Sequence, residues 1–349
     1  MNDRRFTRRA FVAAASAPLA ALAARQARAD KLPVTEESHR VQPVQTHVHA
    51  PPPGTAPSPS AIERALQQTV GTLRGLRPEE FVRRFDWGKA STLPDGRTLR
   101  EYEIVAEDRE LEVAPGVLFP AWTYNGSVPG PTLRCTQGDR LRIRFRNNSV
   151  SEHTIHFHGI HPIHMDGAVE VVKQGGSYVY EFDAEPAGLH LYHCHVPPVA
   201  LHLSRGLYGA FIIGSRNPRR DRPTELVMVA SGWDLDFDER NELYVVNGAA
   251  NYYRDHPIRI RVGERVRLYF VNMLEHDPIN SLHLHATFFR SYRTDAADEV
   301  GEYTDIITLC QADRRIVEFA YEYPGTYMFH AHQNKFAERG WMAHFEVVP

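Results

Sequence analysis

From about residue 98 onward, apolar and polar residues alternate along the chain. Leu141-Arg-Ile-Arg-Phe145 and Tyr178-Val-Tyr-Glu-Phe182 show the pattern, which is typical of antiparallel strands with one buried face. Turn signals separate such runs at Asn125-Gly126 and Pro129-Gly130-Pro131. The sequence therefore predicts an all-β fold of two Greek-key β-sandwich domains, preceded by a short N-terminal helical segment.

The helical segment is expected before residue 98. Between residues 61 and 85, apolar side chains recur at helical spacing, at Ile62, Leu66, Val70, Leu73 and Leu76. We interpret 61–97 as a helical lead-in that packs on a domain flank and ends in a loop near 88–98. Residues 30–60 are rich in Pro, Thr and Ser, so we expect a flexible arm there.

The first 29 residues read as an export signal. Thr7-Arg8-Arg9-Ala10-Phe11-Val12 is a twin-arginine core, and an Ala-rich run leads to a small-residue cleavage site at Ala27-Arg28-Ala29. The apolar run is too short and too rich in Ala for a membrane span. We expect a mature chain that begins near Asp30 in a bacterial periplasm, with secretion as the second choice.

The strand-rich part contains an internal duplication. Gly138-Asp-Arg-Leu-Arg-Ile-Arg-Phe145 is repeated as Gly263-Glu-Arg-Val-Arg-Leu-Tyr-Phe270, and Pro186-Ala-Gly-Leu-His-Leu-Tyr-His193 as Tyr323-Pro-Gly-Thr-Tyr-Met-Phe-His330. The repeat of roughly 110 to 130 residues is long enough for a whole domain. The polar segment 216–222 is the expected boundary, with one domain at 98–215 and the other at 223–349.

Candidate metal ligands cluster in the first copy. Because side chains alternate faces along a strand, Cys194 points away from His193 and His195, and His153 points away from His156 and His158. One face collects Cys194 with His153, and His202 follows shortly after. A trigonal site of two imidazoles and one thiolate is the geometry of a blue-copper (type 1) electron-transfer centre.

The second copy repeats the histidine pairs but not the thiolate. Ala331 stands where Cys194 stands in the first copy, and Asn280 stands where His153 stands, so we expect no blue centre there. Two pairs from each copy exceed the needs of one copper and fit a three-copper cluster shared between two domains: His156, His158, His193, His195, His283, His285, His330 and His332.

With these motifs, the chain resembles the two-domain multicopper oxidases that carry their blue copper in the first domain. The resemblance covers roughly residues 98 to 349 and is carried by HTIHFHG (153–159), MDG (165–167), HCH (193–195) with His202 and Gly206-Leu207, HLH (283–285) and HAH (330–332). It implies cupredoxin-like domains and laccase-like oxidation of small reductants coupled to four-electron reduction of O₂ to water. It also implies four copper ions per subunit and a homotrimer, with each cluster between two subunits.

Further roles follow for residues near these motifs. Leu207 occupies the axial position of the blue centre, where many relatives carry Met, and we expect a raised reduction potential because Leu cannot coordinate. By resemblance, Asp166 donates protons near the cluster or tunes bound water, although an ordinary turn acid before Gly167 is the competing interpretation. His161 and His164 either support the ligands or line an entrance, or they lie on the surface.

Several other residues have weaker interpretations. Tyr252 and Tyr253 could border a reductant site on a neighbouring subunit. We expect Cys135 and Cys310 to be buried free thiols rather than a disulfide, although an oxidising compartment permits the bond. His39, His47 and His49 in the arm either capture copper or belong to a solvated tail, which we favour.

Two other functions compete with the oxidase. A copper nitrite reductase would need only one further copper, held by three histidines, and a storage or electron-carrier protein would need no cluster at all. Among oxidases, phenols or aromatic amines are the expected reductants, with cuprous ion as the alternative; the chain has only 6 Met. The net charge of −3 and the sequence pI near 6.7 give no indication of a nucleic-acid partner.

Overall fold

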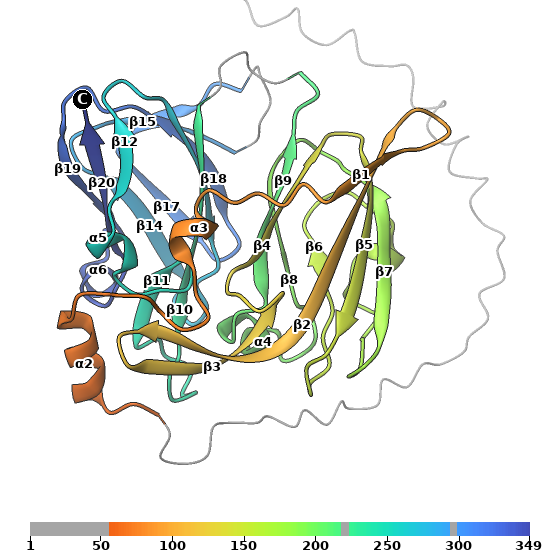
Figure 1. The fold of residues 1–349 in the computed structure, drawn as a ribbon, viewed down its shortest axis with the longest axis horizontal. Helices are drawn as coiled ribbons and strands as arrows, with labels where there is room; N and C mark the ends of the chain where they lie inside the picture. Colours follow the sequence, from red (N-terminus) through yellow and green to blue (C-terminus); the bar gives the residue numbers. More distant parts are fainter. Residues whose placement is uncertain (1–55, 218–222, 294–298) are drawn as a thin grey trace, which may run out of the picture. The chain divides into compact units, whose positions relative to one another are not determined.

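The computed structural model describes residues 56–217, 223–293 and 299–349. All of them belong to one compact unit, His47–Pro349, in which most elements are strands (Figure 1). The expected signal at 1–29, most of the arm and the three arm histidines lie outside the described residues, and so does most of the expected boundary at 216–222.

The first half of the described chain forms two sheets. One has the strand order β1-β2-β5-β7, with β3 paired to β2, and the other has the order β4-β9-β8-β6. Their bounds are β1 Lys89–Thr92, β2 Thr98–Ala114, β3 Val117–Tyr124, β4 Gly130–Thr136, β5 Arg140–Asn147, β6 His156–Phe157, β7 Ser177–Asp183, β8 Gly188–His193 and β9 Tyr208–Gly214.

The second half also forms two sheets, with the orders β11-β10-β13-β18-β15-β16 and β12-β20-β19-β14-β17. Their bounds are β10 Thr224–Trp233, β11 Leu243–Val246, β12 Ile258–Arg261, β13 Val266–Asn272, β14 Ile279–Leu284, β15 Phe289–Tyr292, β16 Glu302–Thr304, β17 Ile306–Cys310, β18 Arg314–Phe319, β19 Gly325–His330 and β20 Met342–Val348.

Strand pairing confirms the duplication at the level of topology. β2 pairs in parallel with β5, as β10 does with β13, and β4 pairs in parallel with β9, as β12 does with β20. The antiparallel pairs correspond as well: β6 with β8 places His156 opposite His193, and β14 with β19 places His283 opposite His330. The all-β, cupredoxin-like prediction is therefore confirmed.

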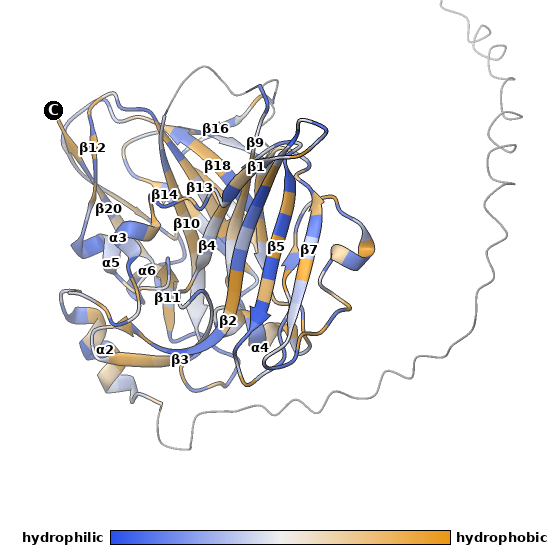
Figure 2. Ribbon diagram, turned by 45° about the vertical axis from the view of Figure 1, so that its right-hand side comes forward, coloured by the Kyte–Doolittle hydropathy of each residue, from blue (hydrophilic) through white to orange (hydrophobic). Residues whose placement is uncertain are grey.

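The alternating pattern has the expected physical basis. Along β5, Leu141, Ile143 and Phe145 are buried, while Arg142 and Arg144 point outward and form ion pairs with Glu101 or Glu181 on the neighbouring strands. Figure 2 shows the resulting bands of hydrophilic and hydrophobic residues along β5 and β7. By contrast, every residue of β13 is buried, so that strand is covered on both faces.

The predicted continuous helix over 61–85 is wrong. Helix α2 covers only Pro59–Gln67, capped by Ser58, and α3 covers Pro78–Phe81. Gln68 is extended and Gly75 has a φ of +78°, a backbone conformation that ends helical geometry and that glycine adopts without strain. The lead-in 61–97 also contains strand β1, which pairs with β2.

The apolar residues of the lead-in are nevertheless buried in the core. Val70, Leu73 and Leu76 are at most 2% exposed and belong to the same cluster as the apolar residues of the second half. The lead-in is held there by polar contacts to α5 (Tyr252–Asp255): the Val70 N–H donates to Asp255, and the Val70 carbonyl lies 2.8 Å from His256 Nε2. It therefore packs on a flank, as predicted, but as an irregular strap.

This packing contradicts the prediction that Tyr252 and Tyr253 border a reductant site. Tyr252 and Tyr253 are 7% and 2% exposed, and their hydroxyls donate to Glu79 and to the Pro78 carbonyl. They anchor the lead-in instead of bordering a reductant site.

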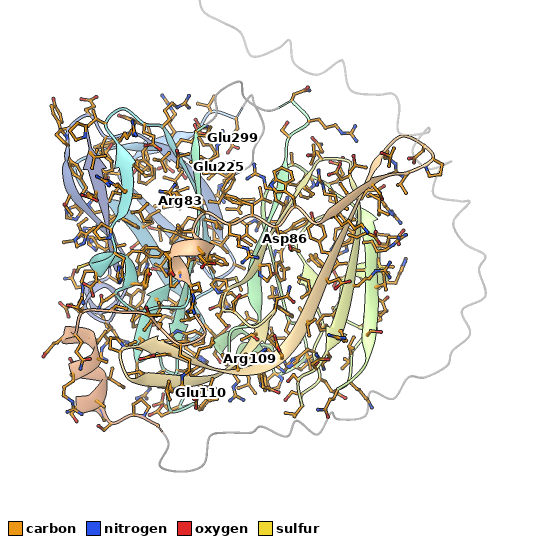
Figure 3. The ribbon with its side chains drawn as sticks, viewed as in Figure 1. Arg83, Asp86, Arg109, Glu110, Glu225 and Glu299 are labelled. Atoms are coloured by element: carbon orange, nitrogen blue, oxygen red, sulfur yellow. The ribbon has the colours of Figure 1, made fainter. Side chains whose placement is uncertain are left out.

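Polar contacts also join the two sheet pairs. Figure 3 labels Arg83, Asp86 and Glu225 near this seam. Arg83 donates to the Arg259 carbonyl, and the backbone of Asp86 bonds to that of β4. Glu225 accepts hydrogen bonds from Arg134 and Tyr269.

The remaining helices are short: α4 Val199–Ser204, α6 Asn334–Glu338 and the 3₁₀ turn η1 Ile163–Met165. No helix among the described residues is long and apolar enough to cross a membrane. Cys135 and Cys310 carry no disulfide. Cys135 is buried as expected, but Cys310 is exposed, which corrects the expectation for that thiol.

Candidate metal centres

The predicted type 1 ligands converge in one buried cluster. Cys194 Sγ lies 3.2 Å from His202 Nδ1 and 3.8 Å from His153 Nδ1, and the two Nδ1 atoms are 3.2 Å apart. His153 and Cys194 are fully buried and His202 is 3% exposed. Three different segments bring them together: the bridge of residue 153 to Val172, the end of β8, and α4.

The donor chemistry of this cluster fits a copper ion. Burial lowers the pKa of His202 to about 4 and that of His153 well below its usual value, so both imidazoles are neutral and can ligate at pH 7. Burial raises the pKa of the Cys194 thiol to about 11, so a thiolate forms only when a cation replaces its proton. The Thr154 N–H donates to Sγ at 3.5 Å, which helps to orient the sulfur.

The residue expected at the axial position lies beside the cysteine. The Leu207 carbonyl accepts the Cys194 N–H at 3.0 Å, and the Leu207 N–H donates to the His202 carbonyl. Leu207 is fully buried in the same core cluster as Cys194. An apolar side chain thus stands next to the ligands.

Two residues that were not predicted from the sequence pack beside this cluster. Trp122 on β3 packs against both imidazoles, with centroid distances of 5.0 Å to His153 and 4.7 Å to His202. The guanidinium of Arg205 lies over the indole, 4.6 Å from its centroid, and is 3% exposed. A permanent positive charge is therefore buried beside the type 1 cluster; neither residue belongs to a histidine or cysteine motif.

The first-half histidines form a second cluster, on the other side of the HCH motif. His158 Nε2 lies 3.2 Å from His193 Nε2, and the ligand atoms of His156, His158 and His193 all lie within 4.8 Å of one another. The His195 ring is 5.2 Å from that of His156. All four histidines of the two pairs predicted in this half are thus brought together.

The second-half histidines repeat this arrangement. His285 Nε2 lies 3.0 Å from His330 Nε2, and the His332 ring is 5.3 Å from that of His283. Among the described residues, no compact group of ligand atoms combines histidines from both halves. Each half therefore has its own group of four histidines, which we call its half-site.

Each half-site carries one aspartate in the same position. His156 Nδ1 lies 2.8 Å from the Asp166 carbonyl and 3.4 Å from its carboxylate. His283 Nδ1 lies 2.8 Å from the Asp305 carbonyl and 3.9 Å from its carboxylate. An Nδ1–H bonded to a carbonyl leaves Nε2 free for a metal. The sequence did not reveal Asp305, because it follows its histidine by 22 positions instead of ten.

The loop histidines differ in position. His161 Nε2 lies 2.8 Å from the Phe157 carbonyl and 3.9 Å from the Asp166 carboxylate, so it supports the loop beside the half-site. His164 is exposed. Gly167 has a φ of +74°, and a Cβ there would lie 1.9 Å from the Ile155 carbonyl oxygen, so only glycine allows the loop to approach this closely.

In the second half, the place of the type 1 cluster is filled with side chains. Ala331 replaces the cysteine, and its N–H donates to Trp341, as Cys194 does to Leu207. The Trp341 indole donates to Asn280, which stands in the place of His153. The Phe336 carbonyl accepts the Trp341 N–H, as the His202 carbonyl accepts the Leu207 N–H. The expected absence of these ligands is thus accompanied by a packed apolar core.

The fold and the sites together define a cupredoxin-like copper protein with two duplicated halves. The family comparison names it further: models of the multicopper oxidase family match residues 106–218 and 215–349. The chain belongs to the multicopper oxidases.

Individual relatives agree with this assignment. A crystal structure of a multicopper oxidase superposes with a TM-score of 0.75 at 49% identity, covering 78% of this chain and 97% of that one. A copper nitrite reductase from Nitrosomonas europaea gives a TM-score of 0.65 at 26% identity, covering 72% of this chain and 94% of that one.

Two curated relatives carry different functional names. The copper-containing nitrite reductase of Neisseria gonorrhoeae is 27% identical over 63% of this chain and 61% of its own length. Copper resistance protein A of Escherichia coli is 30% identical over 52% of this chain and 31% of its own length. The chain thus spans less than two thirds of either relative.

Proposed function

We propose that this oxidoreductase couples one-electron oxidation of small reductants, phenols or aromatic amines, to the four-electron reduction of O₂ to water. The observation that supports this most is the pair of matching four-histidine half-sites beside one thiolate cluster. Bound at these residues, one type 1, one type 2 and two type 3 copper ions would supply four one-electron redox centres, the number that full reduction of O₂ requires.

The chain itself provides the connection between the clusters. Cys194 belongs to the first cluster, and its sequence neighbours His193 and His195 belong to the half-site. The Cys194 carbonyl also lies 2.8 Å from His193 Nδ1, so a hydrogen bond parallels the covalent path. These contacts hold the ligands in fixed orientations, which limits reorganisation during electron transfer.

Reduction of O₂ also needs protons, and each half-site has an acid for this role. Asp166 and Asp305 each present a carboxylate beside the histidine whose Nδ1 their carbonyl fixes. His161 Nε2 lies 3.9 Å from the Asp166 carboxylate and supports the loop that carries it. We propose that both aspartates deliver protons to the side of the cluster that faces them.

We propose further that the complete cluster forms between copies of this chain in a homotrimer. Both half-sites reach the surface, and exposed apolar residues flank each of them: Ile160, Ile163 and Val169 beside the first, and Phe288, Tyr303 and Tyr323 beside the second. A cavity of about 590 Å³ opens at the second half-site and is lined by His283 and His285. The half-sites complement each other in ligands and in apolar surroundings.

Mixed assemblies test this arrangement. A variant with His158→Ala lacks the first half-site and one with His285→Ala lacks the second. Each should be inactive alone, and co-assembled subunits should regain part of the activity, because some interfaces then combine two intact halves. A fully active monomer would refute the shared cluster.

The relatives keep two alternatives open. The compact group His156, His158 and His193 could hold a single copper in a nitrite reductase, the name that some relatives carry. The copper resistance proteins among the relatives favour cuprous-ion oxidation. Copper analysis and O₂ uptake with 2,6-dimethoxyphenol, Cu(I) and nitrite separate these functions. Four coppers per chain with phenol-driven O₂ uptake support the proposal; two coppers with nitric oxide release refute it.

We also propose export to the periplasm by the twin-arginine route, on the basis of Arg8 and Arg9 in the sequence. Cell fractionation of wild type and of a variant with both arginines changed to Lys tests it. Retention of the variant in the cytoplasm is the expected result, and unchanged export of the variant refutes this route.

A further inference from the structure

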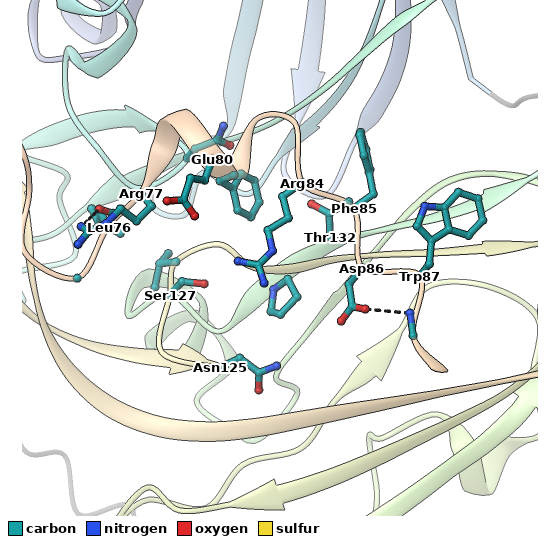
Figure 4. Close-up of a pocket in the computed structure, with 16 residues that line it drawn as sticks. Leu76, Arg77, Glu80, Arg84, Phe85, Asp86, Trp87, Asn125, Ser127 and Thr132 are labelled. Atoms are coloured by element: carbon teal, nitrogen blue, oxygen red, sulfur yellow. Dashed lines mark hydrogen bonds between the residues drawn. The ribbon is translucent and has the colours of Figure 1, made fainter. Parts of the chain in front are cut away.

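A cavity of about 530 Å³ lies between the lead-in and the turn that joins β3 to β4. Residues 75–88 form one wall and residues 125–132 much of the other, and Asn247 completes it. Figure 4 shows the aromatic side chains of Phe85 and Trp87 at one end of it. The volume is in the range of small-molecule sites. Much of its wall precedes the part of the chain that the family models match, which begins at residue 106.

Most polar groups in this cavity already have partners. Arg77 donates to the Leu73 and Leu76 carbonyls, and Asp86 accepts the Gly88 N–H. The side-chain amides of Asn125 and Asn247 are bonded to backbone atoms. These groups shape the wall and are not available to a ligand without losing those bonds.

Three polar side chains remain available. Within the described residues, no hydrogen bond or ion pair engages the side chains of Arg84 or Glu80. Figure 4 shows Arg84 extending into the cavity, with Glu80 on one side and Asp86 on the other. Thr132 is 2% exposed, and its buried hydroxyl has no hydrogen-bond partner. A buried unpartnered hydroxyl is costly unless a ligand or water bonds to it.

The cavity also lies close to the type 1 cluster. Val128 lines it, and the Val128 side chain packs on Gly206 so tightly that a Cβ at Gly206 would lie 2.5 Å from Val128 Cγ2. Gly206 precedes Leu207, whose backbone bonds directly to Cys194 and His202. One layer of packed atoms therefore separates the cavity from the backbone that holds the type 1 ligands, whose own rings are too buried for direct contact.

We propose that this cavity binds the reductant and that its preferred class is an uncharged hydroxybenzene, such as a catechol or aminophenol. The charged lining of two arginines and two acids is balanced, which disfavours a net charge on the ligand. Donors on Arg84 and Thr132 match a phenol oxygen, and the Glu80 carboxylate matches its hydroxyl proton. On one-electron oxidation, the O–H bond would break and its proton would pass to Glu80, while a Cu(II) ion held by His153, Cys194 and His202 would supply the one-electron acceptor.

This inference rests on the proposed function only for the last step, so binding is tested without copper. 4-Nitrocatechol is hard to oxidise, and its absorption changes when a hydroxyl ionises. Titrated into the copper-free protein at a pH below its first pKa, it should bind with the spectrum of its un-ionised form. Arg84→Gln and Glu80→Gln should each weaken binding about tenfold, the size expected for a hydrogen bond to a charged group. Arg83→Gln removes the same charge one residue away, outside the cavity, and should change nothing.

A second measurement uses the copper-loaded protein. The ratio of kcat/KM for catechol to that for ferrocyanide, which has no hydroxyl group, should fall about tenfold in Arg84→Gln and in Thr132→Val, and stay unchanged in Arg83→Gln. Equal binding of 4-nitrocatechol by the Arg84 and Arg83 variants, or no binding by wild type, overturns the assignment of the cavity. If wild type binds 4-nitrocatechol but shows no O₂ uptake with any reductant, the proposed oxidase function is refuted and the assignment of the cavity is not.

Discussion

The charge of Arg205 should raise the reduction potential of the type 1 centre. The Arg205 guanidinium lies 4.6 Å from the Trp122 centroid, and that centroid lies 4.7 Å from the His202 ring. The guanidinium is therefore within about 9 Å of the ligand. At an effective dielectric constant near 20, two unit charges at that distance interact by about 2 kcal/mol. Cu(I) carries one positive charge less than Cu(II), so a neighbouring cation favours the reduced state.

An interaction of that size corresponds to roughly 80 mV, since a tenfold change in a one-electron equilibrium is about 59 mV. We expect Arg205→Met to lower the potential by roughly this amount, with the blue absorption band retained because no ligand changes. Spectroelectrochemical titration of that band measures the shift. Arg205→Lys keeps the positive charge, so its reduction potential should stay close to that of wild type. Burial lowers the pKa of Arg205, and the negative charge of nearby Asp108 only partly opposes this; because Asp108→Asn removes that negative charge, it should move the potential upward.

An Arg205→Met protein with an unchanged potential would refute this reasoning, because it would mean that the charge is fully screened at the copper. A fall of equal size in Arg205→Lys would assign the effect to lost packing on Trp122 instead of lost charge. The buried position of the guanidinium makes screening weak, and burial itself lowers the pKa of Arg205 to about 10, still high enough for full ionisation at pH 7.

Three further outcomes are expected. Asp166→Asn and Asp305→Asn should each lower kcat at least tenfold with four coppers retained by metal analysis; wild-type turnover would refute the proton role. Leu207→Met should lower the type 1 potential by supplying an axial donor, and an equal or higher potential would contradict this. Burial lowers the pKa of His158 from its ordinary value of 6.5 to about 3 and that of His193 to about 4. Between pH 4 and 6.5 the unfolded chain therefore binds more protons than the folded chain. The free energy of unfolding of copper-free protein should therefore fall as the pH drops through that window, measured by urea denaturation; a flat profile would count against it.

The ligand pairs could be predicted from the sequence because side-chain parity on a strand is a local property. The His-x-His pairs at the ends of β14 and β19 each present two rings on one face, because the backbone there is extended. The duplication then showed that the two copies are equivalent. Because the copies are equivalent, His283 pairs with His330 across β14 and β19, as His156 pairs with His193 across β6 and β8.

The residues around the ligands could not be predicted in the same way. Asp305, Trp122 and Arg205 reach the sites through loops and cross-strand packing, which leave no periodic signal. The lead-in shows a related failure: Val70 and Leu73 are buried at helical spacing, but tertiary contacts in an irregular strap produce the same spacing. Periodicity reports which residues are buried and does not by itself fix the backbone that buries them.

The second half shows how a copy without the thiolate keeps the geometry of its paired histidines. Ala331 removes the thiolate, and Phe336 and Trp341 fill the volume that imidazole and metal would need, with the indole bonded to Asn280. The backbone bond from Ala331 to Trp341 is the same as that from Cys194 to Leu207, so the flanking histidines keep their register. A core without polar ligands is more stable than an empty metal site with unpaired imidazoles. Only the first copy therefore has the His153, Cys194 and His202 group, whereas both copies keep four paired histidines.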